Sequence, residues 1–261
     1  MILSGYVASV FIGISLGLIG GGGSILTVPV LVYLFGIDAS LATVYSLFVV
    51  GTTSAVGSVN YFKKGLVDVR TAVFFGIPSI VAIFFTRQYI LPLIPAVIFS
   101  AGDHSFTRNM LLMLLFALLM IAASYSMIRK ENTAGQQTNM SYRHIFLQGI
   151  FTGMVTGLIG AGGGFLIIPA LVNFLRLPMK TAIGTSLLII SVNSLTGFLF
   201  SLHNNAVHWN FLLSIAALAI AGIVIGSKLS TKIKSARLKT VFGWFVLVMG
   251  IYIILKETFF K

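Results

Sequence analysis

The sequence contains no cysteine and few acidic residues, and both shortages exclude classes of function. Without cysteine there is neither a disulfide framework nor a thiolate metal site. The five acidic residues fall at expected loops or near the C-terminus, and no Ser–His or paired-carboxylate constellation stands out, which argues against an enzyme. The histidines lack a second ligand type four residues away, so we expect no metal ion and no cofactor. They are His104, His144, His203 and His208.

Charge of either sign is also scarce. Charged residues make up 8% of the chain and hydrophobic residues 57%, and the mean hydropathy is +1.04. This composition predicts an integral membrane protein. The net charge of +12 would suit nucleic acid in a soluble protein, but here Lys and Arg lie between or at the edges of apolar segments, where they set membrane orientation. We therefore expect the lipid bilayer as a partner, and no nucleic acid.

Eight apolar segments divide the chain, and two of them are too long for one crossing. The segments cover residues 4–35, 39–62, 71–91, 109–128, 145–175, 181–202, 209–227 and 240–255. Six are near the ~20 residues that span hydrocarbon. A continuous helix over the first would be about 48 Å long, well beyond a ~30 Å core. Both long segments carry four consecutive small residues at their middle, 20–23 and 160–163, where we expect a helix break.

The two long segments contain the same motif. GLIGGGGSILTVPVLV at 17–32 returns as GLIGAGGGFLIIPALV at 157–172, and the register is kept downstream, for example from Ser46 to Ser186. This repetition indicates one duplicated unit. The spacing Gly13-x-x-x-Gly17 and its copy Gly153-x-x-x-Gly157 predict a small-residue face that approaches another backbone closely.

The distribution of basic residues favours re-entrant hairpins over full crossings. If all eight segments cross, Lys and Arg divide almost evenly between the two sides, whereas with hairpins at 4–35 and 145–175 most lie on one side. Each repeat then has three crossings, so the second is inverted. We predict an all-α membrane protein of two inverted-topology repeats, 1–128 and 144–261, each a glycine-broken re-entrant hairpin followed by three transmembrane helices. A cytoplasmic linker at 129–143 joins them, and both termini are periplasmic.

The glycine breaks predict an anion site. Irregular backbone inside a membrane must be buried in protein or line a watery cavity. A half-helix that begins near Ser24 or Gly164 would direct free N–H groups and its dipole at such a cavity. Polar residues of the next helices would add donors. The predicted substrate-binding residues are Gly22, Gly23, Ser24, Gly162, Gly163 and Gly164 as backbone donors, and Tyr45, Ser46, Thr185, Ser186 and Asn193 as side-chain donors.

Two further considerations bear on this interpretation. We expect no Asp, Glu, Lys or Arg deep within a span, which argues against a cation pump.

The glycines could instead serve only tight helix packing, in a structural or assembly protein of the membrane. Packing explains the GxxxG spacing, but it does not explain a run of glycines at the same place in both halves.

The sequence resembles the TauE/SafE family of sulfite exporters over nearly its whole length. The resemblance rests on GLIGGGGSILTVPVL, on GLIGAGGGFLIIPAL with AIGTSL at 182–187, and on the stretch 197–209 that ends in VHW. It implies transport of a small sulfur-containing oxyanion or organic sulfonate, such as sulfite or sulfoacetate, across the bacterial inner membrane. A passive anion channel and an uptake permease for a related anion are the alternatives, and a homodimer is left open.

The sequence departs from the family pattern in its first half. ATVYS at 42–46 stands where the second half has AIGTS, and Lys63-Lys64 replaces a histidine-containing stretch. We therefore expect unequal half-sites, with Tyr45 facing Thr185, and substrate choice residing in that asymmetry.

Overall fold

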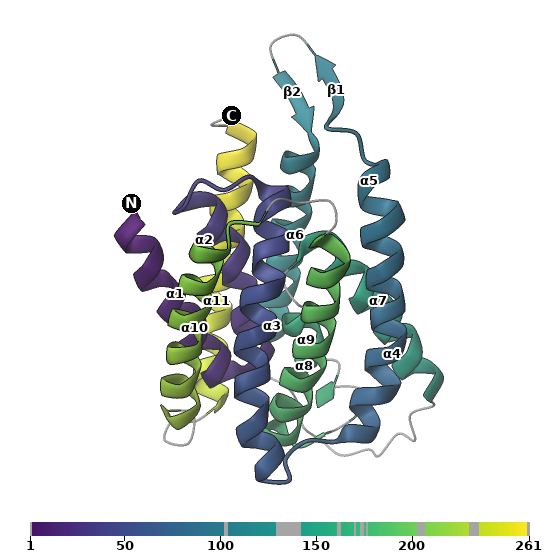
Figure 1. The fold of residues 1–261 in the computed structure, drawn as a ribbon, viewed down its shortest axis with the longest axis vertical. Helices are drawn as coiled ribbons and strands as arrows, with labels where there is room; N and C mark the ends of the chain where they lie inside the picture. Colours follow the sequence, from purple (N-terminus) through teal and green to yellow (C-terminus); the bar gives the residue numbers. More distant parts are fainter. Residues whose placement is uncertain are drawn as a thin grey trace.

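The computed structural model describes residues 2–101, 104–128, 142–160, 163–169, 171–172, 175, 177–202, 207–229 and 235–259. Long helices lie along the vertical axis of the molecule, and both termini point to its upper end (Figure 1). The helical elements are α1 (Ile2–Ile19), the 3₁₀ segment η1 (Gly20–Leu26), α2 (Thr27–Tyr33), α3 (Ala39–Lys63), α4 (Val69–Phe85), the π-helical segment η2 (Thr86–Ile90), α5 (Leu91–Leu93), α6 (Arg108–Ile128), α7 (Tyr142–Ile159), α8 (Gly164–Pro169), α9 (Met179–Leu202), α10 (Trp209–Leu229) and α11 (Ser235–Phe259).

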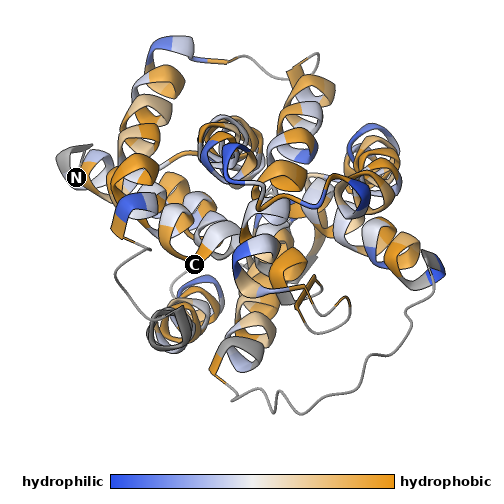
Figure 2. Cartoon of the chain, turned by 90° about the horizontal axis from the view of Figure 1, so that it is seen from below, coloured by the Kyte–Doolittle hydropathy of each residue, from blue (hydrophilic) through white to orange (hydrophobic). Residues whose placement is uncertain are grey.

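Five helical runs are long and apolar enough to cross a membrane. They are Ala39–Lys63, Val69–Leu93, Arg108–Tyr125, Met179–Leu202 and Trp209–Leu229. By its 25 residues, α11 also has sufficient length. Large apolar side chains face outward, such as Phe11, Leu118 and Leu199, each about 60% exposed. Figure 2 shows hydrophobic residues along the helices and hydrophilic residues mainly at their ends. These features confirm a helical, multi-pass membrane protein.

A short antiparallel pair of strands, which the sequence analysis did not predict, joins α5 to α6. Strands β1 (Val97–Ala101) and β2 (His104–Thr107) lie at the upper end of the molecule (Figure 1). Phe99 pairs with Phe106, and their rings stack with centroids 5.1 Å apart. Cross-strand aromatic pairs of this kind stabilise a hairpin. This pair is a local addition to an otherwise helical fold.

The first helix of each half packs on a helix of the other half through small residues. On α1, a Cβ built on Gly13 would lie 1.9 Å from the carbonyl oxygen of Ala219 on α10. On α7, a Cβ on Gly153 would lie 2.3 Å from the carbonyl oxygen of Ser79 on α4. The expected close approach of the GxxxG faces is therefore confirmed. The two pairs are equivalent, because α1 and α7 occupy matching places in the two halves, as do α10 and α4.

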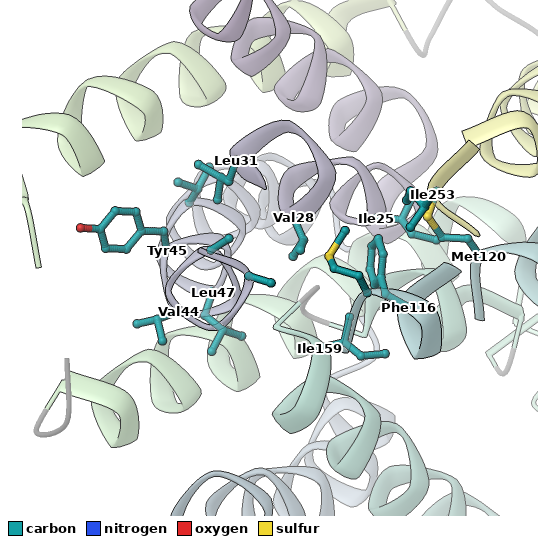
Figure 3. Packing of buried hydrophobic residues seen from close by; sticks show 14 of the residues in the cluster. Ile25, Val28, Leu31, Val44, Tyr45, Leu47, Phe116, Met120, Ile159 and Ile253 are labelled. Carbon is teal, nitrogen blue, oxygen red and sulfur yellow. The ribbon is translucent and has the colours of Figure 1, made fainter. Parts of the chain in front are cut away.

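Two more helix pairs join the halves, and each consists of one helix and its equivalent in the other half. Helix α3 packs on α9 at Gly51, whose Cβ position lies 2.9 Å from Leu195 Cγ, and α6 packs on α11 at Gly250, whose Cβ position lies 3.2 Å from Ala117 O. The core between these pairs includes residues of η1 and α2. Figure 3 shows Ile25 beside Phe116 and Met120 of α6, with Ile159 of α7 close by. The two halves therefore share one core.

The proposed boundary between the halves falls largely outside the described residues. Helix α6 ends at Ile128 and α7 begins at Tyr142, and residues 129–141 lie between them. The division into 1–128, a linker at 129–143 and 144–261 stays a prediction.

Candidate functional site

The two glycine runs interrupt their helices at the same point and with the same backbone conformation. Helix α1 ends at Ile19 and α7 at Ile159, and the residues that follow, Gly20 and Gly160, have φ of +72° and +73°. This left-handed conformation favours glycine, because a Cβ would crowd the neighbouring carbonyl group. The duplicated motif thus encodes the same helix break in both halves.

Just beyond the breaks, the two runs touch each other. A Cβ built on Gly21 would lie 2.5 Å from Gly164 Cα, and one built on Gly164 would lie 2.5 Å from Gly21 Cα. The Cδ1 methyl of Ile190 on α9 lies 2.5 and 2.6 Å from these two Cβ positions. The two glycine runs therefore meet in the folded chain. Glycine at both positions allows this backbone contact, since any side chain would overlap it.

The segments after the breaks differ between the halves. Helix α8 begins at Gly164, as expected, but in the first half the chain forms the 3₁₀ segment Gly20–Leu26, and α2 begins only at Thr27. A helical stretch Gly23–Tyr33 thus begins near Ser24, as expected, but its first turn has 3₁₀ geometry. The Ser24 hydroxyl is buried and donates to the Gly21 carbonyl oxygen at 2.7 Å. Four glycines with low helix propensity and a serine bonded to nearby backbone favour the tighter turn.

The remaining glycines predicted as backbone donors lie in different surroundings. Gly22 is inside η1, and Gly162 is outside the described residues. A Cβ on Gly23 would lie 2.4 Å from the backbone nitrogen of Leu16, so this glycine packs against its own first helix. Its role in substrate binding stays a prediction.

Gly163 begins the half-helix of the second half. Its φ is +65°, and its carbonyl oxygen accepts from the amides of Leu166 and Ile167 at 3.0 and 3.1 Å. Two early amides of α8 are therefore already used. A Cβ on Gly163 would lie 2.2 Å from the Thr156 hydroxyl oxygen. Backbone donation from Gly163 and Gly164 to a substrate stays a prediction.

Buried serines lie at equivalent positions of α3 and α9, and those of α9 share a helix face with a residue that touches the glycine contact. Ser186 and Ser194 lie one helical turn to either side of Ile190, whose side chain touches both glycines, so they share its face of α9. Ser46 and Ser54 are their equivalents on α3. All four are fully buried. Ser186 donates to the Ile183 carbonyl oxygen at 2.9 Å, whereas the hydroxyls of Ser46, Ser54 and Ser194 have no partner among the described residues.

Asn193 supplies a further polar group on α9. Its Nδ2 donates to the Ser79 hydroxyl on α4 at 2.7 Å, and its buried Oδ1 has no partner within the described part of the chain. A buried polar atom without a partner costs about 1–3 kcal/mol. Such atoms are expected where a protein binds a polar ligand, and several of them lie on α3 and α9.

The structure brings Tyr45 and Thr185 to equivalent places but not to each other. The Tyr45 hydroxyl accepts from the backbone N–H of His208 at 2.8 Å, just before α10. The Thr185 hydroxyl accepts from the backbone N–H of Asp68 at 2.9 Å, just before α4. Figure 3 shows the Tyr45 hydroxyl pointing away from the buried cluster. The expectation that Tyr45 faces Thr185 was therefore wrong: each side chain holds the start of a helix in the other half.

These two hydrogen bonds predict a stability effect. Tyr45→Phe and Thr185→Val each leave an amide at a helix start without its acceptor, so each is expected to lower the free energy of unfolding by about 1 kcal/mol. Thermal unfolding in detergent measures this loss, and transport per folded molecule should keep the wild-type substrate KM. A higher KM at an unchanged melting temperature would instead make these hydroxyls substrate ligands, as the sequence analysis predicts.

Arg87 is the largest departure from the sequence-based expectation. It lies in η2, inside the candidate span Val69–Leu93, and only 5% of it is exposed. The expectation that no charged residue lies deep in a span, and that every Arg lies at a segment edge, was therefore wrong. The signal was present, because Arg87 interrupts the apolar segment 71–91. The general rule that basic residues mark segment ends does not hold at this position.

Other buried hydroxyls lie outside the predicted set of substrate-binding residues. Four threonines have side-chain oxygens without a partner among the described residues, and all four are at most 1% exposed. They are Thr27, Thr53, Thr86 and Thr156. Thr53 is the repeat equivalent of Asn193, and that symmetry could have identified it. Within the described ranges there is no group of three or more His, Cys, Asp or Glu side chains that could hold a metal ion.

Comparison with known proteins gives one family and a consistent set of relatives. The family model described as "Sulfite exporter TauE/SafE" matches residues 6–253. A "Probable membrane transporter protein" of Xylella fastidiosa is 30% identical, with 94% of this chain and 92% of that protein covered. The "Probable membrane transporter protein YunE" of Bacillus subtilis is 25% identical, with 97% and 99% covered.

These matches agree with the apolar helices and with the doubled glycine motif. The family model covers nearly the whole chain, including both helix breaks and the contact between them. The relatives are named as transporters, not as enzymes. This protein is thus a membrane transporter that belongs to the TauE/SafE sulfite exporter family.

Proposed function

We propose that this protein is a permease for a small sulfur-containing oxyanion or organic sulfonate, and that it works by alternating access. The observation that carries the proposal is the backbone contact of Gly21 with Gly164, together with buried serine hydroxyls of α3 and α9 that have no partner among the described residues. Hydroxyl and amide donors bind an anion without a fixed countercharge. The family's description as sulfite exporters suggests the chemical class of the anion.

The binding site of this proposal has the glycine contact at its centre. Ser46 and Ser54 on α3, and Ser186 and Ser194 on α9, approach it from the two helices that cross beside it. Asn193 adds an amide. Backbone N–H groups of the glycine runs, including those of Gly163 and Gly164, would complete the donors around an oxyanion. We do not place Tyr45 and Thr185 in the binding site, because their oxygens accept from backbone amides at the starts of α10 and α4.

We further propose that the halves are inverted repeats and that each glycine break is the tip of a re-entrant hairpin. Reciprocal packing of α1 on α10 and of α7 on α4 supports a two-fold relation. The matched hydrogen bonds of Tyr45 and Thr185 support it too. Both termini lie towards one end of the molecule in Figure 1, as inverted three-crossing repeats require.

The same topology gives the orientation in the membrane. With the basic loops in the cytoplasm, both termini would be periplasmic and the linker at 129–143 cytoplasmic, in a bacterial inner membrane. Alternating access then follows if one half rocks against the other about the α3–α9 crossing, which exposes the glycine contact to each side in turn. The buried hydroxyls would bind the anion in both states.

A thermal-shift screen followed by flux measurements tests this function. The purified protein is heated with sulfite, sulfate, thiosulfate, sulfoacetate or simple carboxylates, and we expect one sulfur-containing anion to raise the melting temperature in a saturable way. In vesicles, its flux should saturate and be stimulated by anion on the opposite side. Unitary currents in a planar bilayer would support a passive channel, and the absence of both stabilisation and flux for every anion would contradict transport of this class.

A further inference from the structure

Arg87 is a buried cation with one edge of its guanidinium group unused. Its Nη1 donates to the Ser201 hydroxyl on α9 at 3.2 Å. Its Nε and Nη2 atoms are buried and have no partner among the described residues. These two nitrogens carry the parallel N–H bonds of one guanidinium edge, which is the edge that binds carboxylate, sulfonate or phosphate with two hydrogen bonds.

No described carboxylate neutralises this charge. Asp38 and Asp68 bind the turns that follow them, and Glu257 accepts from the Tyr33 hydroxyl at 3.0 Å. The residue lies six positions before the end of the span Val69–Leu93, about 9 Å inside it at ~1.5 Å per residue. A charged residue at such a depth is costly, and it usually marks a substrate or ion pathway.

The local backbone holds Arg87 next to the second glycine break. It follows Thr86 in the π-helical segment η2, a form that often occurs at functional sites. A Cβ on Gly157 of α7 would lie 2.7 Å from Thr86 Cβ, and Gly157 is three residues before the break at Gly160. The Thr86 hydroxyl is also buried and without a partner in the described part of the chain.

The hydrogen bond to Ser201 connects Arg87 to the serine face of α9. Ser201 lies seven residues, or two turns, after Ser194, so both side chains lie on one face about 10 Å apart along the helix. Arg87 therefore contacts this face of α9 farther along the helix than the glycine contact does, towards one end of the molecule. It is not a member of the central group of hydroxyls.

We propose that Arg87, with Thr86 and Ser201, forms a second anion subsite between the glycine contact and one end of the transport path. Its ligand is the oxyanion or sulfonate head group of the substrate, bound by Nε and Nη2. This inference rests on the proposed function. It adds that the path is asymmetric, because the repeat equivalent of Arg87 is Ser227, which carries no charge. An anion passing Arg87 would meet a buried positive charge that has no counterpart at the equivalent position, Ser227, in the other half.

Substitution of Arg87 tests the subsite in the intact protein. Arg87→Gln is expected to raise the KM for sulfite or sulfoacetate flux at least ten-fold, with an anion-free melting temperature no lower than that of the wild type, since an unpaired buried charge is removed. Arg87→Lys keeps the charge but loses the guanidinium edge that makes two parallel hydrogen bonds. Its KM should therefore lie between those of the wild type and Arg87→Gln. The matched control is Arg70→Gln, which removes an exposed charge from the same helix and should leave KM unchanged.

The possible failures are distinguishable. If the wild-type protein neither binds nor transports any of the anions, the proposed function fails. If the wild type transports but Arg87→Gln keeps KM within two-fold, the subsite is overturned while the function stands. Should Arg87→Gln not fold, Arg87→Lys decides: a wild-type KM overturns the subsite, and a several-fold increase at a wild-type melting temperature supports it.

Discussion

Gly164→Val is expected to abolish anion transport. The Cβ position of Gly164 lies 2.4 Å from the Gly21 carbonyl oxygen and 2.6 Å from Ile190 Cδ1, so a valine side chain overlaps backbone that cannot move aside easily. Overpacking of this kind costs about 1–3 kcal/mol of stability. The larger effect is on function, because valine would push apart the two breaks that form the centre of the proposed site. Flux into vesicles, divided by the amount of inserted protein, measures the loss.

Gly76→Ala is the matched control for this experiment. Gly76 is a buried glycine of α4, but no atom of a neighbouring element lies within 4 Å of its Cβ position. Alanine should therefore be accepted and should raise stability by about 0.5–1 kcal/mol through its better helix propensity. Near-normal flux in inserted Gly164→Val would show that the glycine contact is not the transport site.

Joint replacement of Ser54 and Ser194 by alanine is expected to make the protein more stable and less active. Both hydroxyls are fully buried without partners among the described residues, and an unsatisfied buried hydroxyl costs about 1–3 kcal/mol. Their removal should raise the melting temperature. If they donate to the anion, the lost hydrogen bonds, each about 1.5–3 kcal/mol to a charged group, should raise the substrate KM ten-fold or more.

Ser124→Ala serves as the comparison. Ser124 is also fully buried, but on α6, and its hydroxyl donates to the Ile121 carbonyl oxygen at 2.7 Å. Its replacement should leave both the melting temperature and KM close to the wild type. An unchanged KM in the double alanine variant would remove Ser54 and Ser194 from the site, whatever the melting temperature.

The helical parts of the fold could be predicted well because they depend on local composition. Hydropathy alone located the helix that became Ala39–Lys63 and its copy Met179–Leu202 to within a few residues. The glycine runs marked both helix breaks, since glycine propensity is also a local property. The strands around Phe99 and Phe106 could not be predicted from the long apolar segments, because residues 97–107 lie between two of them.

The candidate site was predicted only in part. Repetition of the motif identified the glycine runs that meet at Gly21 and Gly164. It did not reveal that Tyr45 and Thr185 bind backbone amides at the helix starts of the opposite half, because those partners, His208 and Asp68, are more than 100 residues away in sequence. The 3₁₀ turn at Ser24 was missed for a different reason: a serine can bond to its own backbone in several ways, and propensity does not choose among them.

The sequence by itself determined the membrane environment, the duplication and the positions of the helix breaks, since each depends on residue type at fixed spacing along the chain. Only the tertiary structure decided which faces meet: α1 on α10, α7 on α4, and Gly21 on Gly164. It also decided the surroundings of Arg87, which the fold buries against Ser201, although the charge pattern predicted basic residues only between or at the edges of apolar segments. The physical reason is that burial depends on which distant helices pack around a residue, and no local pattern carries that information.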